Sequence, residues 1–257
     1  MIIRRILIAC LAGVAVVIGG GRTGLADLIS IGAAKDNTLY ESATGGLSNG
    51  AGDHFFAGIT GQNRIVRGLI AFDVAGSIAA GSTINSVTLT LNMSQTNSGD
   101  TTVGLHNVLQ NWGEGTSDAP SGEGGGAAAT NGDATWLHRF FNTSSWTNAG
   151  GDFNSTASAA QTVGGIGAYT WVSTAQTVAD VQSWLDSPAG NFGWLVLGDE
   201  TKTAKRFDTR ENPLAANRPL LTIEFQQVPE PASITLLAVG GLLYLVGRGW
   251  RRLKMAA

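Results

Sequence analysis

The stretch from Ser86 to Ser94 reads Ser-Val-Thr-Leu-Thr-Leu-Asn-Met-Ser, and apolar and polar side chains alternate along it without a break. Successive side chains of a β-strand point to opposite faces of the sheet, so this pattern predicts a strand with one buried and one exposed face. The residues expected on the buried face are Val87, Leu89, Leu91 and Met93. The fold class is therefore expected to be all-β.

Short segments of the same kind recur on both sides of this stretch. Leu221, Ile223 and Phe225 alternate with Thr222 and Glu224. Further strand candidates lie at residues 37–41, 54–58, 65–74, 103–109, 136–140, 168–172 and 194–197. Clusters of Gly, Asn, Ser and Asp separate them. Many short strands divided by turn residues predict a β-sandwich or a jelly roll.

One short helix is expected to interrupt the strands at residues 178–186. Thr177 followed three residues later by Asp180 is an acidic variant of the capping box that starts many helices. Pro188 favours an end at Ser187, because proline disfavours helix in the residue before it. The apolar residues that share one helical face are Val178, Val181, Trp184 and Leu185.

The composition excludes several classes of protein. An apolar content of 43% in 257 residues is enough for a core, so a wholly disordered chain is excluded. A single cysteine excludes a disulfide framework and a cysteine-based metal site, and three scattered histidines exclude most histidine-rich metal clusters. A pI near 5.6 argues against a nucleic-acid-binding protein.

The N-terminal segment, residues 1–26, has the three parts of a secretory signal peptide. Arg4 and Arg5 supply the positive charge, residues 6–18 form an apolar stretch, and Gly24-Leu25-Ala26 is a small-x-small cleavage site. The apolar stretch is shorter than the roughly 20 residues that a membrane-spanning helix needs. Export by the general secretion machinery and cleavage by signal peptidase before Asp27 are therefore expected.

The C-terminal segment, residues 228–257, combines a Pro-Glu-Pro motif, a short apolar run and a basic end. The motif is Pro229-Glu230-Pro231, and residues 234–246 form the apolar run. The basic cluster consists of Arg248, Arg251, Arg252 and Lys254. An apolar run followed by basic residues is a stop-transfer pattern with the tail in the cytoplasm, and an ordinary membrane anchor is one explanation of it.

The order of these parts resembles the PEP-CTERM sorting signal of Gram-negative bacteria. The resemblance implies recognition by an exosortase and cleavage near Pro229-Glu230-Pro231. It also implies transfer to the cell envelope, the cell surface or the extracellular matrix. Contact with the membrane would then be made only by the C-terminal transmembrane helix, before processing.

The region between the two ends, residues 27–227, is clearly acidic. Seven of the 16 basic residues but only one of the 19 acidic residues lie in the terminal segments, which leaves 9 basic and 18 acidic residues and a net charge of −9. Such a surface suits solubility outside the cell and repels nucleic acids.

Several segments of this region together resemble the DNRLRE domain. In chain order they are residues 35–40, 67–73, 81–91, 111–115, the 178–185 helix, 206–211 and 217–223. The resemblance implies a jelly-roll β-sandwich that covers nearly all of residues 34–225 and is carried by secreted proteins. Some members of that family bind acidic polysaccharides such as alginate and are classed as carbohydrate-binding modules.

Catalytic patterns are weak in this region. His54, His106 and His138 are not accompanied by a Gly-x-Ser-x-Gly nucleophile elbow. Residues 113–133 and 148–167 are Gly-rich, so they are expected to form long loops that bury little apolar surface and hold no precise geometry. No cofactor motif is present, and Asp199-Glu200 is the one pair considered for calcium. The sequence therefore predicts a protein without enzymatic activity.

Binding candidates come from tryptophans near the Gly-rich segments and from arginines that can pair with carboxylated sugars. They are Trp112, Trp136, Arg64, Arg67 and Arg139. The alternative for the tryptophans is packing inside the sandwich, and Arg206, Arg210 and Glu211 are expected to form a structural ion-pair network. The leading functional hypothesis is a surface or matrix protein with an adhesive or structural domain. The alternatives are a carbohydrate-binding module and, less favoured, a polysaccharide lyase or hydrolase.

Overall fold

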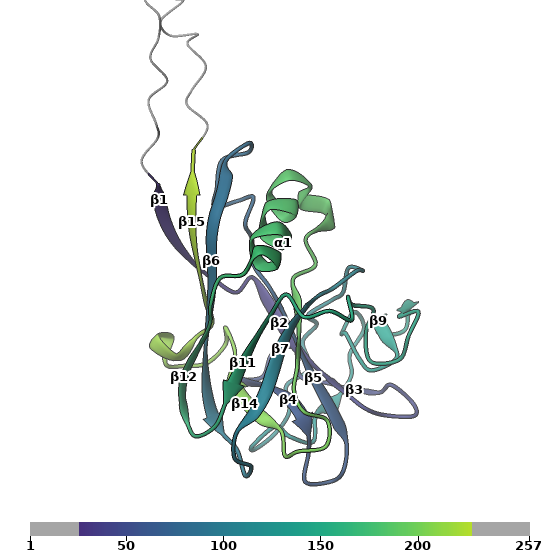
Figure 1. Ribbon diagram of the computed structural model, residues 1–257. Helices are drawn as coiled ribbons and strands as arrows, with labels where there is room; N and C mark the ends of the chain where they lie inside the picture. Colours follow the sequence, from purple (N-terminus) through teal and green to yellow (C-terminus); the bar gives the residue numbers. More distant parts are fainter. Residues whose placement is uncertain (1–25, 228–257) are drawn as a thin grey trace, which may run out of the picture. The chain divides into compact units, whose positions relative to one another are not determined.

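The computed structural model describes residues 26–227, which form a mostly β structure with one α-helix (Figure 1). The expected signal peptide lies outside the described residues except for Ala26. The sorting motif Pro229-Glu230-Pro231, the transmembrane helix and the basic cluster also lie outside them. Within the described residues, no helix has the length and apolar character needed to cross a membrane.

Eleven strands form one large, curled antiparallel sheet in the order β1-β15-β6-β14-β4-β5-β13-β7-β11, with β12 also paired to β6 and β2 to β5. Two small sheets pair β9 with β10 and β3 with β8. The bounds are β1 (Asp27–Gly32), β2 (Lys35–Tyr40), β3 (Leu47–Ser48), β4 (His54–Ile59), β5 (Ile65–Ala71), β6 (Thr83–Gln95), β7 (Thr101–Asn107), β8 (Ala127–Ala128), β9 (His138–Phe140), β10 (Ser144–Ser145), β11 (Ala159–Val163), β12 (Gly167–Trp171), α1 (Ala175–Asp186), β13 (Trp194–Leu197), β14 (Lys205–Asp208) and β15 (Leu220–Gln226).

The sheet curls at β4, because this strand changes its partner along its length. His54 to Ala57 pair with β14, whereas Gly58 and Ile59 pair with β5. Gly58 has a φ of +126°, and a Cβ there would lie 2.9 Å from the Cα of Ala204. Glycine thus permits the change of direction that brings two halves of the sheet to face each other.

The expected half-buried strand is confirmed as β6. Its apolar side chains are at most 4% exposed, whereas Thr88 and Thr90 on the other face are half-buried. The α1 helix packs beside β6 and adds Val181, Trp184 and Leu185 to the same core (Figure 1). Burial of these side chains between the curled sheet and the helix is the main source of hydrophobic stabilisation.

The α1 helix begins three residues earlier than expected, and its cap is different. Thr174 is the N-cap, and its hydroxyl accepts a hydrogen bond from the Thr177 backbone, while the Thr177 hydroxyl accepts one from the Thr174 backbone. Asp180 was expected to complete the capping box with Thr177. Instead, the Asp180 side chain is buried against the sheet.

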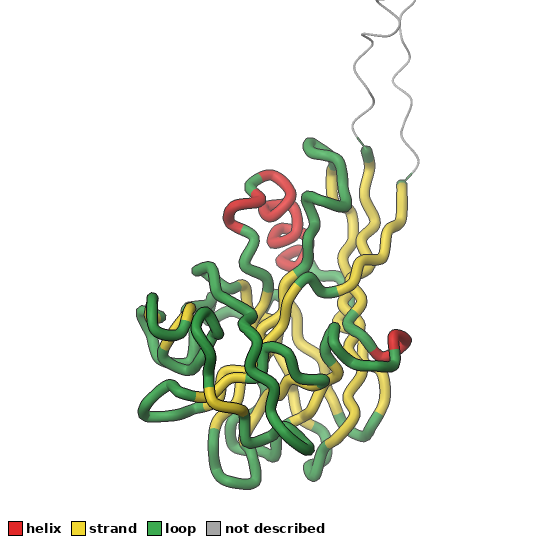
Figure 2. The backbone as a smooth tube through the Cα atoms, turned by 180° about the vertical axis from the view of Figure 1, so that it is seen from behind, coloured by secondary structure: helices red, strands yellow, loops and turns green. Residues whose placement is uncertain are grey.

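A second hydrophobic core covers the outer face of the β2, β5 and β13 part of the sheet. Leu39, Leu69 and Leu195 point to this outer face, and they pack with Trp112, Trp136 and Trp146 from the connections between β7 and β11. Figure 2 shows these connections gathered on one side of the strands. This half of the sheet is therefore buried on both faces.

The expectation that residues 113–133 and 148–167 hold no precise geometry is wrong, because buried carboxylates organise both segments. Asp133 is fully buried and accepts backbone hydrogen bonds from Thr116 and Thr130. Asp152 is 6% exposed and accepts backbone hydrogen bonds from Thr147 and Asn148. Charge-assisted bonds to backbone N–H groups replace much of the apolar burial that these segments lack.

The start and the end of the described chain lie next to each other. Asp27 at the start of β1 pairs with Phe225 near the end of β15, and Gln226 pairs with Thr83 at the start of β6 (Figure 1). Gln95, at the other end of the 13-residue β6, lies about 40 Å away at the usual rise per strand residue. The loop after β6 is therefore far from both chain ends.

Candidate functional site

Both tryptophans proposed as sugar platforms are buried. Trp112 is 1% exposed, donates a 2.8 Å hydrogen bond from Nε1 to the carbonyl of Phe192, and lies 4.0 Å beneath Lys35 Nζ. Trp136 is 9% exposed and lies 4.8 Å beneath the guanidinium of Arg67. Neither ring offers a face for a sugar in this structure, and both belong to the second core.

The side chain of Arg67 is held in place by hydrogen bonds and ring contacts inside the protein. Its Nε donates a 2.7 Å hydrogen bond to Oε1 of Glu200, and its Nη1 donates a 2.9 Å bond to the carbonyl of Gly150. The guanidinium also contacts the Trp136 and Phe153 rings. These partners join β5 to two loops, so the contacts of Arg67 are those of a structural residue.

Arg64 and Arg139 contact different parts of the loop region. Arg64 donates to the carbonyl of Gly125, whereas Arg139 donates to the carbonyls of Asn111 and Ser145. Arg64, Arg67 and Arg139 share none of these partners. Each of the three predicted arginines is therefore held by its own set of contacts within the protein.

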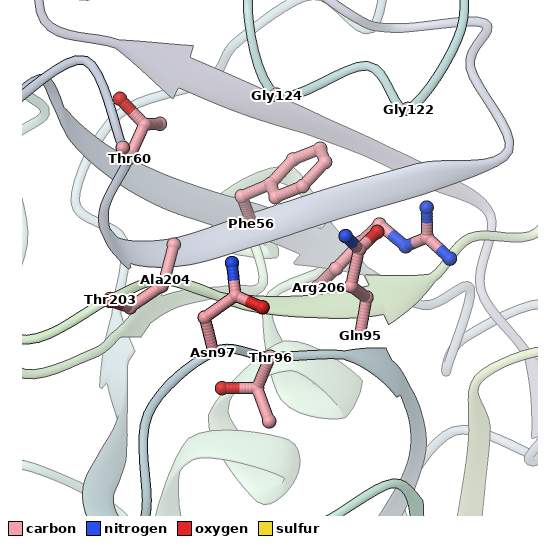
Figure 3. A pocket seen from close by; sticks show the side chains of 11 residues that line it. Phe56, Thr60, Gln95, Thr96, Asn97, Gly122, Gly124, Thr203, Ala204 and Arg206 are labelled. Atoms are coloured by element: carbon pink, nitrogen blue, oxygen red, sulfur yellow. The ribbon is translucent and has the colours of Figure 1, made fainter.

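A pocket lies at the end of the sheet where β6 terminates (Figure 3). Its volume is about 140 Å³, smaller than the roughly 300–1,000 Å³ of pockets that enclose a drug-sized ligand. Strands β4, β6 and β14 and the adjoining loops contribute its lining, which consists of Phe56, Thr60, Gly61, Gln95, Thr96, Asn97, Gly122, Gly124, Thr203, Ala204 and Arg206.

The pocket combines an apolar wall with hydrogen-bonding groups. Phe56 lines it, and Figure 3 shows the amides of Gln95 and Asn97 on the same pocket. Both amide-bearing residues are exposed, and each amide both donates and accepts hydrogen bonds. This mixture can accommodate a ligand that carries several hydroxyl groups.

Arg206 supplies positive charge beside this pocket. Its Nε donates a 3.1 Å hydrogen bond to the Ser94 hydroxyl, which orients the guanidinium. Within residues 26–227, no carboxylate forms an ion pair with it. Arg206 was expected to belong to a structural ion-pair network, but it is separate from the pairs that Arg210 makes.

Arg210 forms an ion-pair network with two glutamates, of which Glu211 was expected and Glu114 was not. It donates to Glu114 from Nε at 2.7 Å and from Nη2 at 2.8 Å, and its Nε lies 2.8 Å from Oε1 of Glu211. Asp36 adjoins this network, because its Oδ2 accepts the Arg210 backbone N–H at 2.9 Å. Burial raises the pKa of Asp36 well above its usual range, and burial also raises the pKa of Glu211.

The carboxylates considered for calcium, Asp199 and Glu200, have separate partners. Asp199 accepts hydrogen bonds from the backbone and hydroxyl of Thr201, and Glu200 pairs with Arg67. The acidic residues that the structure does bring together are Asp36, Glu114 and Glu211. They lie in three segments far apart in the chain, so their spacing in the sequence does not predict that they form a cluster.

The three histidines have partners of different kinds. His54 lies between carboxylates, 3.2 Å from Oε1 of Glu123 and 3.4 Å from Oδ1 of Asp208. His106 bonds the carbonyl of Asn154, and His138 bonds the hydroxyl of the fully buried Thr135. Among these contacts, none pairs a histidine with an accessible serine or cysteine nucleophile.

The chain was compared with known protein families and with curated proteins. No family model matches the chain, and a search of the curated proteins finds no significant match.

Proposed function

We propose that the chain is an exported, non-catalytic protein of a Gram-negative bacterium, displayed at the cell surface or in the extracellular matrix. In this proposal an exosortase processes the C-terminal sorting signal. The described domain, a jelly-roll β-sandwich of the DNRLRE type, then serves an adhesive or structural role. The two facing halves of the curled antiparallel sheet, with one apolar interior between them, support the sandwich assignment.

The observation that carries the proposal is the position of the chain ends. The segments that would lead to the signal peptide and to the sorting signal leave from paired residues, Asp27 and Phe225. A tether at this end leaves the loops at the far end of β6 directed away from the attachment point. This arrangement suits a domain that is displayed on a tether.

The experiment is mass spectrometry of the protein recovered from the cell surface. We expect a C-terminus near Pro229 to Pro231 and an N-terminus at Asp27. Deletion of residues 234–254 is expected to release the protein into the medium, whereas Thr88→Ala, a change in the described domain, leaves the attachment intact. An intact basic tail on most surface copies would instead indicate an ordinary membrane anchor.

A carbohydrate-binding module is the second candidate function, and the pocket beside Arg206 favours it. Amides from Gln95 and Asn97 and the Phe56 ring suit a sugar ring, and the guanidinium suits a sugar carboxylate. A net charge of −9 repels a polyanion over a Debye length of roughly 10 Å at 0.1 M salt, so an acidic polysaccharide needs such a local cation.

The test is calorimetric titration with alginate oligosaccharides. We expect Arg206→Gln and Asn97→Ala to weaken binding about tenfold each, the loss that one good polar contact causes. Arg218→Gln is the matched control, because it removes the same charge from an exposed residue outside the pocket. Unchanged binding in both pocket variants would exclude this site.

Two further outcomes separate the remaining hypotheses. If neither acidic nor neutral oligosaccharides bind, the adhesive role does not use this pocket and the structural role is favoured. If the oligosaccharides are shortened during incubation, or unsaturated products absorb in the ultraviolet, the protein is a hydrolase or a lyase and the non-catalytic proposal is wrong.

A further inference from the structure

Three carboxylates from distant parts of the chain converge beside the start of β2. Asp36 lies on β2, Glu114 lies in the connection after β7, and Glu211 lies in the connection between β14 and β15. One oxygen from each lies within 4.8 Å of the others. Like charges at this separation repel, so the cluster needs compensation by positive charge or protons.

Two oxygens of this cluster are buried without a hydrogen-bond partner. Asp36 is 0% exposed, and its Oδ1 has no hydrogen-bond partner. The Oε2 atom of Glu211 is also buried and also has no partner. Buried carboxylate oxygens are normally hydrogen-bonded or bound to a metal, because desolvation without compensation is costly. The two oxygens without a partner therefore point to a cation as the ligand, because a cation binds oxygen lone pairs.

The basic groups nearby leave these two oxygens unpaired. Arg210 directs its side chain to Glu114 and to the other oxygen of Glu211. Lys35 donates from Nζ to the carbonyl of Trp112 at 2.6 Å and to Oδ1 of Asn111 at 3.2 Å. Arg210 is thus the basic side chain that pairs directly with these carboxylates, whereas Lys35 and Arg218 act on Glu114 and Glu211 only through longer-range electrostatic attraction.

We propose that Asp36, Glu114 and Glu211 bind a calcium ion. Calcium takes oxygen ligands at about 2.3–2.6 Å, so two oxygens on opposite sides of one ion are separated by about 5 Å, which accommodates the observed 4.8 Å. All three side chains are hard oxygen donors, and calcium tolerates irregular geometry and additional water ligands. Arg210 is 40% exposed and has room to adjust when the ion enters.

The bound ion joins three segments that the sheet alone does not hold together. It ties β2 to the connection after β7 and to the segment that leads into β15. None of its ligands lines the pocket beside Arg206, so the site is a stabilising one and does not depend on the proposed binding of sugars.

The test is calorimetric titration of the purified exported protein with calcium chloride after treatment with EDTA, together with thermal unfolding. We expect one ion per chain, with a Kd between roughly 1 μM and 1 mM, the range from sensor sites to extracellular modules. Calcium at about 100 times Kd is expected to raise Tm by roughly 5–10 °C.

Asp36→Asn and Glu211→Gln are expected to abolish both the heat of binding and the rise in Tm. Asp118→Asn is the matched control, since it removes an exposed carboxylate outside the cluster. If Asp36→Asn fails to fold, the more exposed Glu211 provides the decisive variant. A flat titration of the unaltered protein with no change in Tm would overturn the proposal, as would retained calcium binding in a folded Glu211→Gln variant.

Discussion

The indole Nε1 of Trp194 donates a 2.8 Å hydrogen bond to Oδ2 of Asp180. Trp194 lies on β13 and is fully buried, whereas Asp180 lies on the inner side of α1 and is 2% exposed. The same carboxylate accepts hydrogen bonds from Ser158 and Gln176. A single buried acidic group therefore connects the only α-helix of the described residues to the sheet and to the segment before β11.

Replacement of Asp180 by alanine should destabilise the protein by about 3 kcal/mol. The change leaves the Trp194 N–H and the Ser158 hydroxyl without an acceptor, and each buried unsatisfied group costs about 1–3 kcal/mol. The measurement is the free energy of unfolding in urea. Asp186→Ala, an exposed change on the same helix, is the control and should stay within about 0.5 kcal/mol. Equal effects of the two variants would contradict the role assigned to Asp180.

The two faces of β6 should respond differently to truncation. Leu89 is 1% exposed in the core, so Leu89→Ala is expected to cost about 2–5 kcal/mol. Thr90, the next residue, points to the outer face and bonds only Thr170 through its hydroxyl, so Thr90→Ala should cost less than about 1 kcal/mol. Chemical denaturation of both variants tests the assignment, and a Leu89 variant as stable as the Thr90 variant would refute it.

Periodicity in the sequence predicts the elements that have one buried face. The alternation from Val87 to Met93 and the helical spacing of Val181 and Trp184 each report one interior side, and both elements form as expected. The second core escaped prediction because its aromatic residues, among them Trp146, are spaced irregularly along Gly-rich connections. Regular spacing of apolar residues does not predict a core that is formed by side chains from loops.

The candidate pocket depends on topology, which a single sequence does not display. Phe56, Asn97 and Arg206 come from three strands or loops that only the pairing of β4, β6 and β14 brings together. The sequence predicted a ligand-binding role for Arg67 and a structural ion-pair role for Arg206, whereas in the structure Arg67 forms the ion pair and Arg206 lines the pocket. Their roles are distinguished by partners distant in sequence, such as Glu200, which lies 133 positions from Arg67.

Replacement of Arg67 should therefore affect stability. Arg67→Ala removes a half-buried ion pair with Glu200, a bond to the Gly150 carbonyl and the stacking on Trp136, at an expected cost of about 1–3 kcal/mol. Arg139→Ala, which loses two 3.2 Å bonds and a distant contact with the Phe140 ring near the surface, should cost less than about 1 kcal/mol by the same reasoning. Thermal unfolding distinguishes the two, and an unchanged Tm for Arg67→Ala would restore Arg67 as a ligand-binding candidate.

Acid should weaken the attachment of the loop that contains Glu123. Burial opposes ionisation of this carboxyl, but the hydrogen bonds from His54 and Asn49 outweigh it and lower its pKa below the usual 4.5. A lowered folded pKa gives a stabilisation that is complete above the unfolded value and disappears as the pH falls through the folded value.

Measurements of the free energy of unfolding between pH 7 and pH 3 test this relationship. We expect a decline that begins below about pH 4.5 and is shallower in Glu123→Gln, which has no proton to gain. Asp118→Asn alters an exposed carboxyl and should retain the full decline. A Glu123→Gln profile as steep as that of the unaltered protein would show that other carboxylates cause the acid sensitivity.

Gly193, immediately before β13, should tolerate no side chain. Its φ is +76°, and an added Cβ would lie 2.0 Å from the carbonyl oxygen of Ile70 on the neighbouring strand. Gly193→Ala therefore combines an unfavourable backbone conformation, about 1–2 kcal/mol, with a displacement of β5, about 1–3 kcal/mol.

Gly99→Ala is the control, because a Cβ there meets nothing within 4 Å and its φ lies outside the left-handed region. Reduced entropy of the unfolded chain should leave that control neutral or slightly stabilised. Urea denaturation should separate the two alanine variants by at least about 2 kcal/mol, and coincident curves would mean that β13 does not approach β5 as closely as described.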